Sequence, residues 1–159
     1  MKKRAVFLDR DGVINHAVVR DGKPYPPAGV EEVEILPGVQ EGLHRLKDAG
    51  YILIVVSNQP DVSRGITSRK TVEEINDRLA KELPIDRFLV CYHDDSDDCD
   101  CRKPNPGMLI AGAEEFDIDL RSSFIIGDRW KDMEAGISVG CSTIFIDRGY
   151  NEKQPEVFD

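Results

Sequence analysis

The sequence predicts an α/β fold in which five parallel strands form a doubly wound, Rossmann-like sheet. The first observation is a set of five short β-branched and aromatic runs, which read as buried strands because they are apolar on both faces. These runs span residues 5–8, 51–56, 87–90, 123–126 and 143–146. The second is that amphipathic stretches separate them, which favours parallel strands joined by right-handed helical crossovers. The third is the length of 159 residues, which suits a single domain spanning 1–159.

Four helices are predicted between the strands, from apolar residues that recur at helical spacing. Pro37 and Gly50 bound the first helix, Pro106 lies in the first turn of the third, and the fourth covers roughly 131–139. The residues expected to face the sheet are Val39, Leu43 and Leu46 in the first helix, Val72, Ile75 and Leu79 in the second, Leu109, Ala113 and Phe116 in the third, and Met133 and Ile137 in the fourth.

Two segments lie outside this pattern. Residues 15–36 contain Pro24, Pro26 and Pro27, so they are too irregular for a helix. A long connection beside an active site is commonly a lid or a substrate wall, here a specificity loop, although a tolerated surface insertion has the same appearance. No insertion is large enough to form a cap domain. The tail after Gly149 is expected to pack loosely.

Composition and charge exclude several classes of function. Apolar residues make up 40% and charged residues 32% of the chain, as in a soluble globular protein. The net charge of −9 argues against a nucleic-acid partner, because such a partner requires a basic surface. The apolar run after Met-Lys-Lys-Arg is too short for a signal peptide, and no segment approaches a membrane span. We therefore expect a cytoplasmic monomer with no membrane partner.

Polar motifs follow the predicted strands, at the edge of the sheet where ligands bind in this architecture. Asp9 and Asp11 come directly after the first strand and share one side of the chain. They can divide the roles of nucleophile and proton donor, although Asp-x-Asp-Gly alone is also a common turn. Asp128 and Asp132 follow the fourth strand. Carboxylates that converge on one edge would repel each other, which favours Mg²⁺ between them.

The segment 91–104 combines a set of soft metal ligands with a pair of cations. Cys91, His93, Cys99 and Cys101 offer three thiolates and one imidazole, a closed tetrahedral set for a structural Zn²⁺. This zinc-binding loop would brace the acidic run between its ligands, which cannot order itself by burying apolar surface. A disulfide between Cys99 and Cys101 is disfavoured by their short separation and by a reducing cytoplasm.

Four motifs resemble, in order, those of the haloacid dehalogenase (HAD) phosphatase superfamily. They are Phe7-Leu-Asp-Arg-Asp-Gly12, Ser57-Asn58, Lys103-Pro104 and Gly127-Asp-Arg-Trp-Lys-Asp132. The resemblance implies that Asp9 attacks phosphorus to form an aspartyl-phosphate, and that Asp11 protonates the leaving oxygen and then activates water. It also implies that Asp9, Asp128 and the Asp11 carbonyl hold Mg²⁺ while Asp132 orients this shell. The phosphoryl group would be bound by Ser57 and Lys103.

The cysteine motif narrows the resemblance to a small branch without caps that contains heptose 1,7-bisphosphate 7-phosphatases and histidinol-phosphatases. The segments similar to the heptose enzymes are Asp9-Arg-Asp-Gly-Val-Ile-Asn15, Asn58-Gln59, Ser63-Arg64-Gly65 and Cys101-Arg-Lys-Pro-Asn-Pro-Gly-Met108. Two features depart from them, namely Pro60-Asp61 and the short span from His93 to Cys99, which is more like the histidinol-phosphatase loop.

The cations indicate the class of substrate. Arg64, Arg102 and Arg129 exceed what one phosphate beside Lys103 requires, which favours a second phosphate, although pairing with surface carboxylates would also account for Arg64 and Arg129. Histidinol is itself a cation and would be poorly hosted. The expected substrate contacts are Ser57, Asn58, Gln59, Arg64, Arg102, Lys103 and Arg129.

We therefore predict a Mg²⁺-dependent phosphatase acting on a small phosphorylated sugar, most specifically on the 7-phosphate of D-glycero-D-manno-heptose 1,7-bisphosphate. Histidinol-phosphatase is the nearest alternative. A non-catalytic module that senses phosphorylated ligands is disfavoured because every catalytic position is filled. A nucleic-acid 3′-phosphatase is disfavoured because the chain lacks a basic groove.

Overall fold

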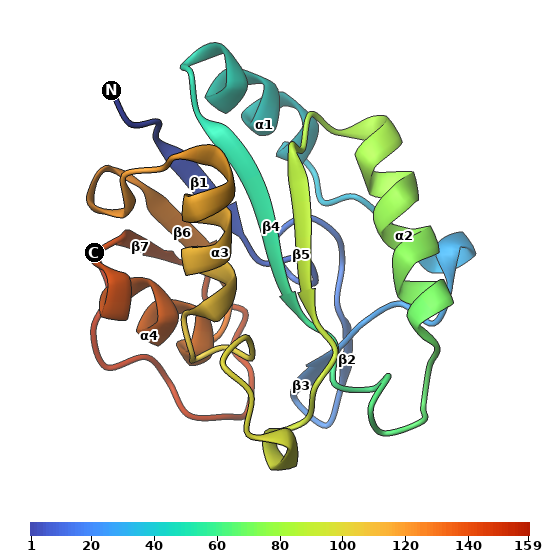
Figure 1. Cartoon of the computed structure of the whole chain (residues 1–159). Helices are drawn as coiled ribbons and strands as arrows, with labels where there is room; N and C mark the ends of the chain where they lie inside the picture. The colour runs from blue at the N-terminus through green and yellow to red at the C-terminus, as the bar shows by residue number, and fades with distance from the viewer.

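Five parallel strands form the central sheet of the computed structural model, which describes all 159 residues (Figure 1). The strands are β1 (Ala5–Leu8), β4 (Ile52–Asn58), β5 (Arg87–Cys91), β6 (Phe124–Gly127) and β7 (Ser142–Phe145). Their order in the sheet is β5-β4-β1-β6-β7, and each pairs in parallel with its neighbours. The predicted strands and their doubly wound arrangement are confirmed, with small shifts at the strand ends.

The central strand β1 is the point at which the winding of the sheet reverses. After β1 the chain builds outward through β4 and β5, and it then crosses to build β6 and β7 on the other side. In such sheets a crevice opens beyond the carboxyl ends of the strands at the reversal, and ligands bind there. Because Asp9 directly follows β1, it stands at the centre of this edge.

Two pairs of helices cover the two faces of the sheet (Figure 1). They are α1 (Val39–Asp48) and α2 (Arg69–Glu82) on one face, and α3 (Gly107–Phe116) and α4 (Trp130–Val139) on the other. Alternate residues of β1 supply both cores: Ala5 and Phe7 lie beneath α3 and α4, whereas Val6 and Leu8 lie beneath α1 and α2. This burial on both faces explains why the strand is apolar throughout. None of the four helices has the length and apolar content that a membrane span requires.

Helix α4 faces the sheet with small residues instead of Ile137. Met133 is fully buried as predicted, but Ile137 is 45% exposed, so the prediction that Ile137 faces inward was wrong. Ala135 and Gly136 occupy the contact, and a Cβ atom on Gly136 would lie 2.3 Å from Ile125 Cγ2. The close approach of helix and strand at Gly136 leaves the next residue directed outward.

The connection between β1 and α1 forms a hairpin followed by a short helical turn. Strands β2 (Val18–Arg20) and β3 (Lys23–Tyr25) pair antiparallel, and the 3₁₀-helix η1 (Val30–Glu32) follows. The hairpin lies at the end of the molecule to which β4 and β5 point (Figure 1). Two further 3₁₀ turns are η2 (Asp95–Asp97) and η3 (Leu120–Ser122). No cap-sized domain interrupts the chain, as predicted.

The tail after Gly149 is anchored at a few points, but most of it is exposed, including Val157 at 66% and Phe158 at 49%, so the prediction of a loosely packed tail was wrong only at those anchors. Tyr150 is only 8% exposed. Further along, the Thr143 backbone N–H donates to Asp159 Oδ2 at 2.7 Å. The rings of Phe145 and Phe158 lie 5.3 Å apart. Because these anchors are single residues in a polar segment, periodicity gives no sign of them.

Candidate active site

A cleft of about 340 Å³ opens at the carboxyl edge of the sheet. Its lining includes Asp9 and Asp11 after β1, residues 23–26 of the hairpin, and the pair Arg102 and Lys103. The lining is almost entirely polar, unlike that of most ligand pockets, so a charged and hydrophilic ligand fits best. The polar motifs that follow the strands therefore converge on one site, as predicted.

Three carboxylates meet at the base of this site. Asp9, Asp128 and Asp132 each place an oxygen within 4.8 Å of the other two. The Lys103 ammonium lies among them, 2.9 Å from Asp9 Oδ1 and 2.6 Å from Asp132 Oδ1, and it also donates to the Val56 carbonyl at 2.8 Å. Lys103 is 2% exposed. One buried ammonium balances only one of the three carboxylates, so the cluster as it stands is short of positive charge.

The pKa values of these groups reflect that shortage. Burial, together with the charge of Asp9, raises the pKa of Asp128 to about 9 and that of Asp132 to about 6. Burial would also raise the pKa of Asp9, but the charge of Lys103 and its hydrogen bond to Asp9 hold that pKa below its usual range. The same carboxylates raise the pKa of Lys103 despite its burial.

A divalent cation fits this cluster. Asp128 Oδ2 accepts a hydrogen bond from the Tyr150 hydroxyl at 2.5 Å, whereas Asp128 Oδ1 is buried with no hydrogen-bond partner. An unpartnered buried carboxylate oxygen is costly unless a cation binds it. Asp132 is already engaged, because Oδ1 accepts from Lys103 and Oδ2 accepts from the Arg129 backbone N–H at 3.1 Å. Hard oxygen ligands of this kind suit Mg²⁺.

Three residues donate hydrogen bonds to the Asp11 carboxylate, and only Gln59 among them was a predicted site residue. The Arg10 guanidinium is fully buried and binds both Asp11 oxygens, with Nε to Oδ1 at 3.1 Å and Nη2 to Oδ2 at 3.2 Å. The Asn15 and Gln59 amides each donate to the same carboxylate at 3.0 Å. Arg10 also donates to Asn76 of α2 at 2.9 Å. Arg10 lies between Asp9 and Asp11, which both face the cleft, so its side chain points to the opposite side, toward the core. This alternation is the sequence signal that could have identified it.

Two of the three polar residues at the carboxyl end of β4 line the cleft. They are Asn58 and Gln59, whereas the predicted substrate contact Ser57 is not part of the lining. Ser57 and Gln59 are each 1% exposed, and Ser57 Oγ accepts a hydrogen bond from Gln59 Nε2 at 2.7 Å. Gln59 thereby links the hydroxyl of Ser57 to the carboxylate of Asp11.

The predicted arginines all line the cleft, and each also pairs with a carboxylate. Arg64 binds Asp94 through two bonds of 2.9 and 2.7 Å, and Arg102 Nε lies 2.7 Å from Asp95 Oδ1. Arg129 binds Glu152, with Nε 3.1 Å from Oε1. Arg64 and Arg129 therefore line the cleft and also pair with nearby carboxylates. The geometry agrees with both interpretations of these two residues.

Two lysines of the cleft were not predicted. Lys23 comes from the hairpin and Lys131 from the first turn of α4. The nearest carboxylate oxygen to Lys131 Nζ is Asp95 Oδ1 at 3.8 Å. Burial and the neighbouring charge of Arg102 lower the pKa of Lys131. No motif marks these lysines, because the hairpin and the helix bring them to the cleft only once the chain has folded.

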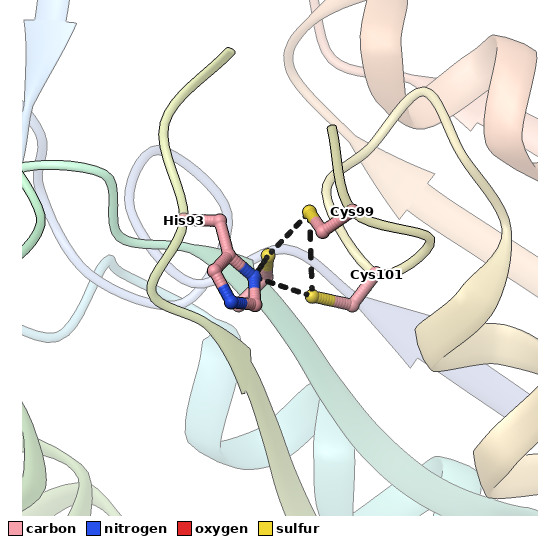
Figure 2. A group of neighbouring side chains, drawn as sticks. His93, Cys99 and Cys101 are labelled. Carbon is pink, nitrogen blue, oxygen red and sulfur yellow. Dashed lines mark hydrogen bonds between the residues drawn. The ribbon is translucent and has the colours of Figure 1, made fainter. Parts of the chain in front are cut away.

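The predicted soft-metal ligands form a compact cluster at the edge of the cleft. Figure 2 shows the side chains of His93, Cys99 and Cys101 pointing toward one another. Cys91 Sγ lies 3.6 Å from Cys99 Sγ and 3.4 Å from His93 Nδ1, and His93 Nδ1 lies 3.2 Å from Cys101 Sγ. A tetrahedral zinc with Zn–S of about 2.3 Å and Zn–N of about 2.0 Å separates sulfurs by roughly 3.8 Å and sulfur from nitrogen by roughly 3.5 Å. The four ligand atoms are therefore spaced to suit Zn²⁺.

Together, the parallel sheet, the acidic pair after its central strand, and the lysine and carboxylates at neighbouring strand ends define a hydrolase of the HAD superfamily. A family model described as HAD-hydrolase-like matches residues 100–157. A solved structure of a putative HAD-like phosphatase from Mesorhizobium loti is 28% identical, with a TM-score of 0.80, and covers 94% of this chain and 78% of its own.

Relatives of nearly full length make the assignment more specific. A Campylobacter jejuni protein, D-glycero-alpha-D-manno-heptose-1,7-bisphosphate 7-phosphatase, is 34% identical over 98% of this chain and 87% of its own length. The corresponding Pseudomonas putida beta-heptose enzyme is also 34% identical, over 96% of this chain and 87% of its own length. The crystal structure of D,D-heptose 1,7-bisphosphate phosphatase from B. bronchiseptica, complexed with magnesium and phosphate, is 32% identical with a TM-score of 0.77, covering 88% of this chain and 78% of its own. The chain belongs to the D-glycero-D-manno-heptose 1,7-bisphosphate 7-phosphatase family, whose members are phosphoric monoester hydrolases.

Proposed function

We propose that this protein is a Mg²⁺-dependent phosphatase that removes the 7-phosphate from D-glycero-D-manno-heptose 1,7-bisphosphate. The observation that carries the proposal is the position of Asp9. It lies at the base of a cleft rich in cations, hydrogen bonded to Lys103 and adjacent to two further buried carboxylates. A carboxylate held ionised in such a site is a competent nucleophile toward phosphorus. Membership of a family named for this reaction supports the same conclusion.

The positions of these residues in the cleft support the following catalytic roles. Asp9 attacks phosphorus, and the bond from phosphorus to the sugar oxygen breaks to leave an aspartyl-phosphate. Asp11 gives a proton to the departing sugar oxygen and later takes one from the water that hydrolyses the intermediate. Lys103 keeps Asp9 ionised and neutralises charge on the transferred group. Gln59 and Arg10 hold the Asp11 carboxylate for both proton transfers.

Asp9, Asp128 and the Asp11 backbone carbonyl would hold the Mg²⁺, with Asp132 orienting this shell through Lys103. When bound, the ion supplies positive charge to a phosphoryl oxygen and to the developing transition state. The unpartnered Oδ1 of Asp128 supports this placement. Asp132 is assigned to orientation because both of its oxygens already accept hydrogen bonds within the protein.

A substrate with two phosphates would account for the remaining cations of the cleft. Arg64, Arg102, Arg129 and Lys131 lie beyond what one phosphoryl group at Asp9 needs. A distal phosphate would meet these cations, and the sugar would lie against residues 23–26 of the hairpin, the part of the 15–36 loop that lines the cleft. Histidinol phosphate would place its own cation among them. The alternative of a histidinol-phosphatase is therefore disfavoured electrostatically.

The proposal also includes a structural metal in the zinc-binding loop 91–104. Cys91, His93, Cys99 and Cys101 would hold a structural Zn²⁺ that fixes the loop carrying Arg102 and Lys103. The spacing of the four ligand atoms supports this. Free thiols suit a reducing cytoplasm, where we place this monomeric, single-domain enzyme.

The decisive experiment compares phosphate release from both anomers of the heptose bisphosphate with release from histidinol phosphate. We expect kcat/KM to be at least about tenfold higher for a heptose bisphosphate, as binding of a second phosphate would give. Asp9→Asn should abolish turnover, whereas Asp48→Asn, at the exposed end of α1, should leave it unchanged. Faster turnover of histidinol phosphate would overturn the assignment of the substrate, and an active Asp9→Asn enzyme would overturn the mechanism.

A further inference from the structure

The two oxygens of Asp128 have different surroundings. Oδ2 accepts a hydrogen bond from the Tyr150 hydroxyl at 2.5 Å, and Oδ1 has no partner although it is buried. Asp128 is 2% exposed and Tyr150 is 8% exposed, so the pair is shielded from solvent. A carboxylate fixed through one oxygen can present the other in a single direction.

Tyr150 comes from a segment that is tied down on three sides. We define the C-terminal strap as residues 147–154. Arg148 Nε donates to the Gly12 carbonyl at 3.1 Å, and the Asn151 backbone N–H donates to the Gly22 carbonyl of the hairpin turn at 2.7 Å. Glu152 accepts from Arg129 Nε at 3.1 Å. The strap therefore spans the acidic turn after β1, the hairpin and the start of α4.

Gly12 shows how closely this region is packed. Its backbone has a φ of +91°, which favours glycine. A Cβ atom there would lie 1.9 Å from Asp128 Oδ2 and 2.8 Å from the Tyr150 hydroxyl oxygen. The Asp128 carboxylate is thus confined between the turn and the strap, and it cannot rotate without losing the Tyr150 hydrogen bond.

We propose that Tyr150 is a positioning residue that directs Asp128 Oδ1 toward the catalytic Mg²⁺. This inference rests on the metal site of the proposed function. Hydrogen bonds from outer residues to ligating carboxylates fix their orientation, and their loss weakens metal affinity by about 10- to 100-fold. Tyr150 acts through Asp128 and contacts neither the substrate nor the ion.

The test measures Mg²⁺ binding without substrate. Unmodified protein, Tyr150→Phe, Tyr51→Phe and Phe158→Leu are each exchanged by gel filtration into Mg²⁺-free buffer, which leaves a tightly held zinc in place. Tyr51 lies beneath Arg4 just before β4, at the opposite end of the strand from the cleft, and Phe158 packs on Phe145 in the tail. Each protein is then titrated with MgCl₂, and the dissociation constant is obtained from calorimetry and from the rise in melting temperature.

We expect Tyr150→Phe alone to weaken Mg²⁺ binding by about 10- to 100-fold while its circular dichroism matches that of the unmodified protein. Equal Mg²⁺ affinity in Tyr150→Phe and the unmodified protein would overturn this inference and leave the proposed function standing. An equal loss of Mg²⁺ affinity in Phe158→Leu would show that Tyr150 has only a general structural role, and would also overturn the inference. Failure of the unmodified protein to bind Mg²⁺ would overturn the inference and the proposed metal site together.

Discussion

Asn58, the last residue of β4, forms two hydrogen bonds with the backbone of Lys103 in the loop 91–104. Its Nδ2 donates to the Lys103 carbonyl at 3.0 Å, and its Oδ1 accepts from the Lys103 N–H at 3.0 Å. The end of β4 is thereby joined to the loop that carries the lysine of the carboxylate cluster. Although Asn58 lines the cleft, both polar atoms of its side chain are occupied by this link.

We expect Asn58→Ala to lower kcat by about 10- to 100-fold, because a shift of the Lys103 backbone moves its ammonium away from Asp9. Asn58→Asp should cause a smaller loss, since an oxygen remains to accept from the Lys103 N–H. Steady-state kinetics on the heptose bisphosphate would measure both variants. A rise in KM at constant kcat would show instead that Asn58 acts mainly by contacting the substrate.

The buried carboxylates predict an unusual dependence of stability on pH in Mg²⁺-free protein. The pKa values of Asp128 and Asp132 are raised in the folded state to about 9 and about 6, from an ordinary value of 3.8. The folded protein therefore binds more protons than the unfolded chain in this range, and its free energy of unfolding falls as pH rises from about 4 to about 9. The lowered pKa of Asp9 acts only below this window, and the raised pKa of Lys103 only above it.

Urea denaturation across that window should record a free energy of unfolding that falls steadily toward pH 9 for the Mg²⁺-free protein. Asp128→Asn should flatten the curve above about pH 6, because it removes the group that titrates there. Saturating Mg²⁺ should restore stability at the alkaline end, since the ion favours ionised carboxylates. Stability that rises toward pH 9 in the absence of Mg²⁺ would contradict the proposed proton balance.

Removing zinc should loosen the loop and misplace Lys103. Elemental analysis should find about one zinc per chain in the unmodified protein and in Cys141→Ala, whose thiol is buried away from the cluster, but not in Cys99→Ser. We expect chelation to lower the melting temperature by roughly 4–8 °C, as a loss of about 2 kcal/mol would do, and to raise KM for the substrate. Added Mg²⁺ should not reverse either change. Full activity in zinc-free protein would refute a structural role for the metal.

Lys131 should contribute to affinity for the distal phosphate. Lys131→Ala should reduce kcat/KM for the heptose bisphosphate by about 10- to 100-fold, the usual effect of losing a charged hydrogen bond. The same variant should retain its kcat/KM for a heptose carrying only the 7-phosphate. Lys70→Ala, whose side chain is 85% exposed on α2, is the matched control. An equal loss on both substrates would place Lys131 at the transferred phosphate instead.

Much of the candidate site could be predicted because its residues follow strands. Asp9, Ser57 and Asp128 each come directly after or at the end of a run of apolar residues, and parallel strands carry such positions to one edge. The Cys/His cluster could also be predicted, since Cys91 and Cys101 lie within one short segment and thiols at that density suit a metal.

The remainder depends on packing that no local pattern records. Ile137 has the spacing of an inward residue, but the close contact of Gly136 with the sheet directs it to solvent. Tyr150 lies in a polar tail without periodicity. In each case a contact distant in sequence decides the side chain's environment.

The strap has a consequence for the protein while it is being made. The acidic turn after β1 is synthesised before Tyr150 and Glu152, which hold Asp128 and Arg129. A nascent chain can therefore pair its early strands before the carboxylates of the candidate site are held in place. Because the proposed role of Tyr150 needs the strap, a nascent chain that still lacks residues 147–154 should be folded in part but catalytically inactive.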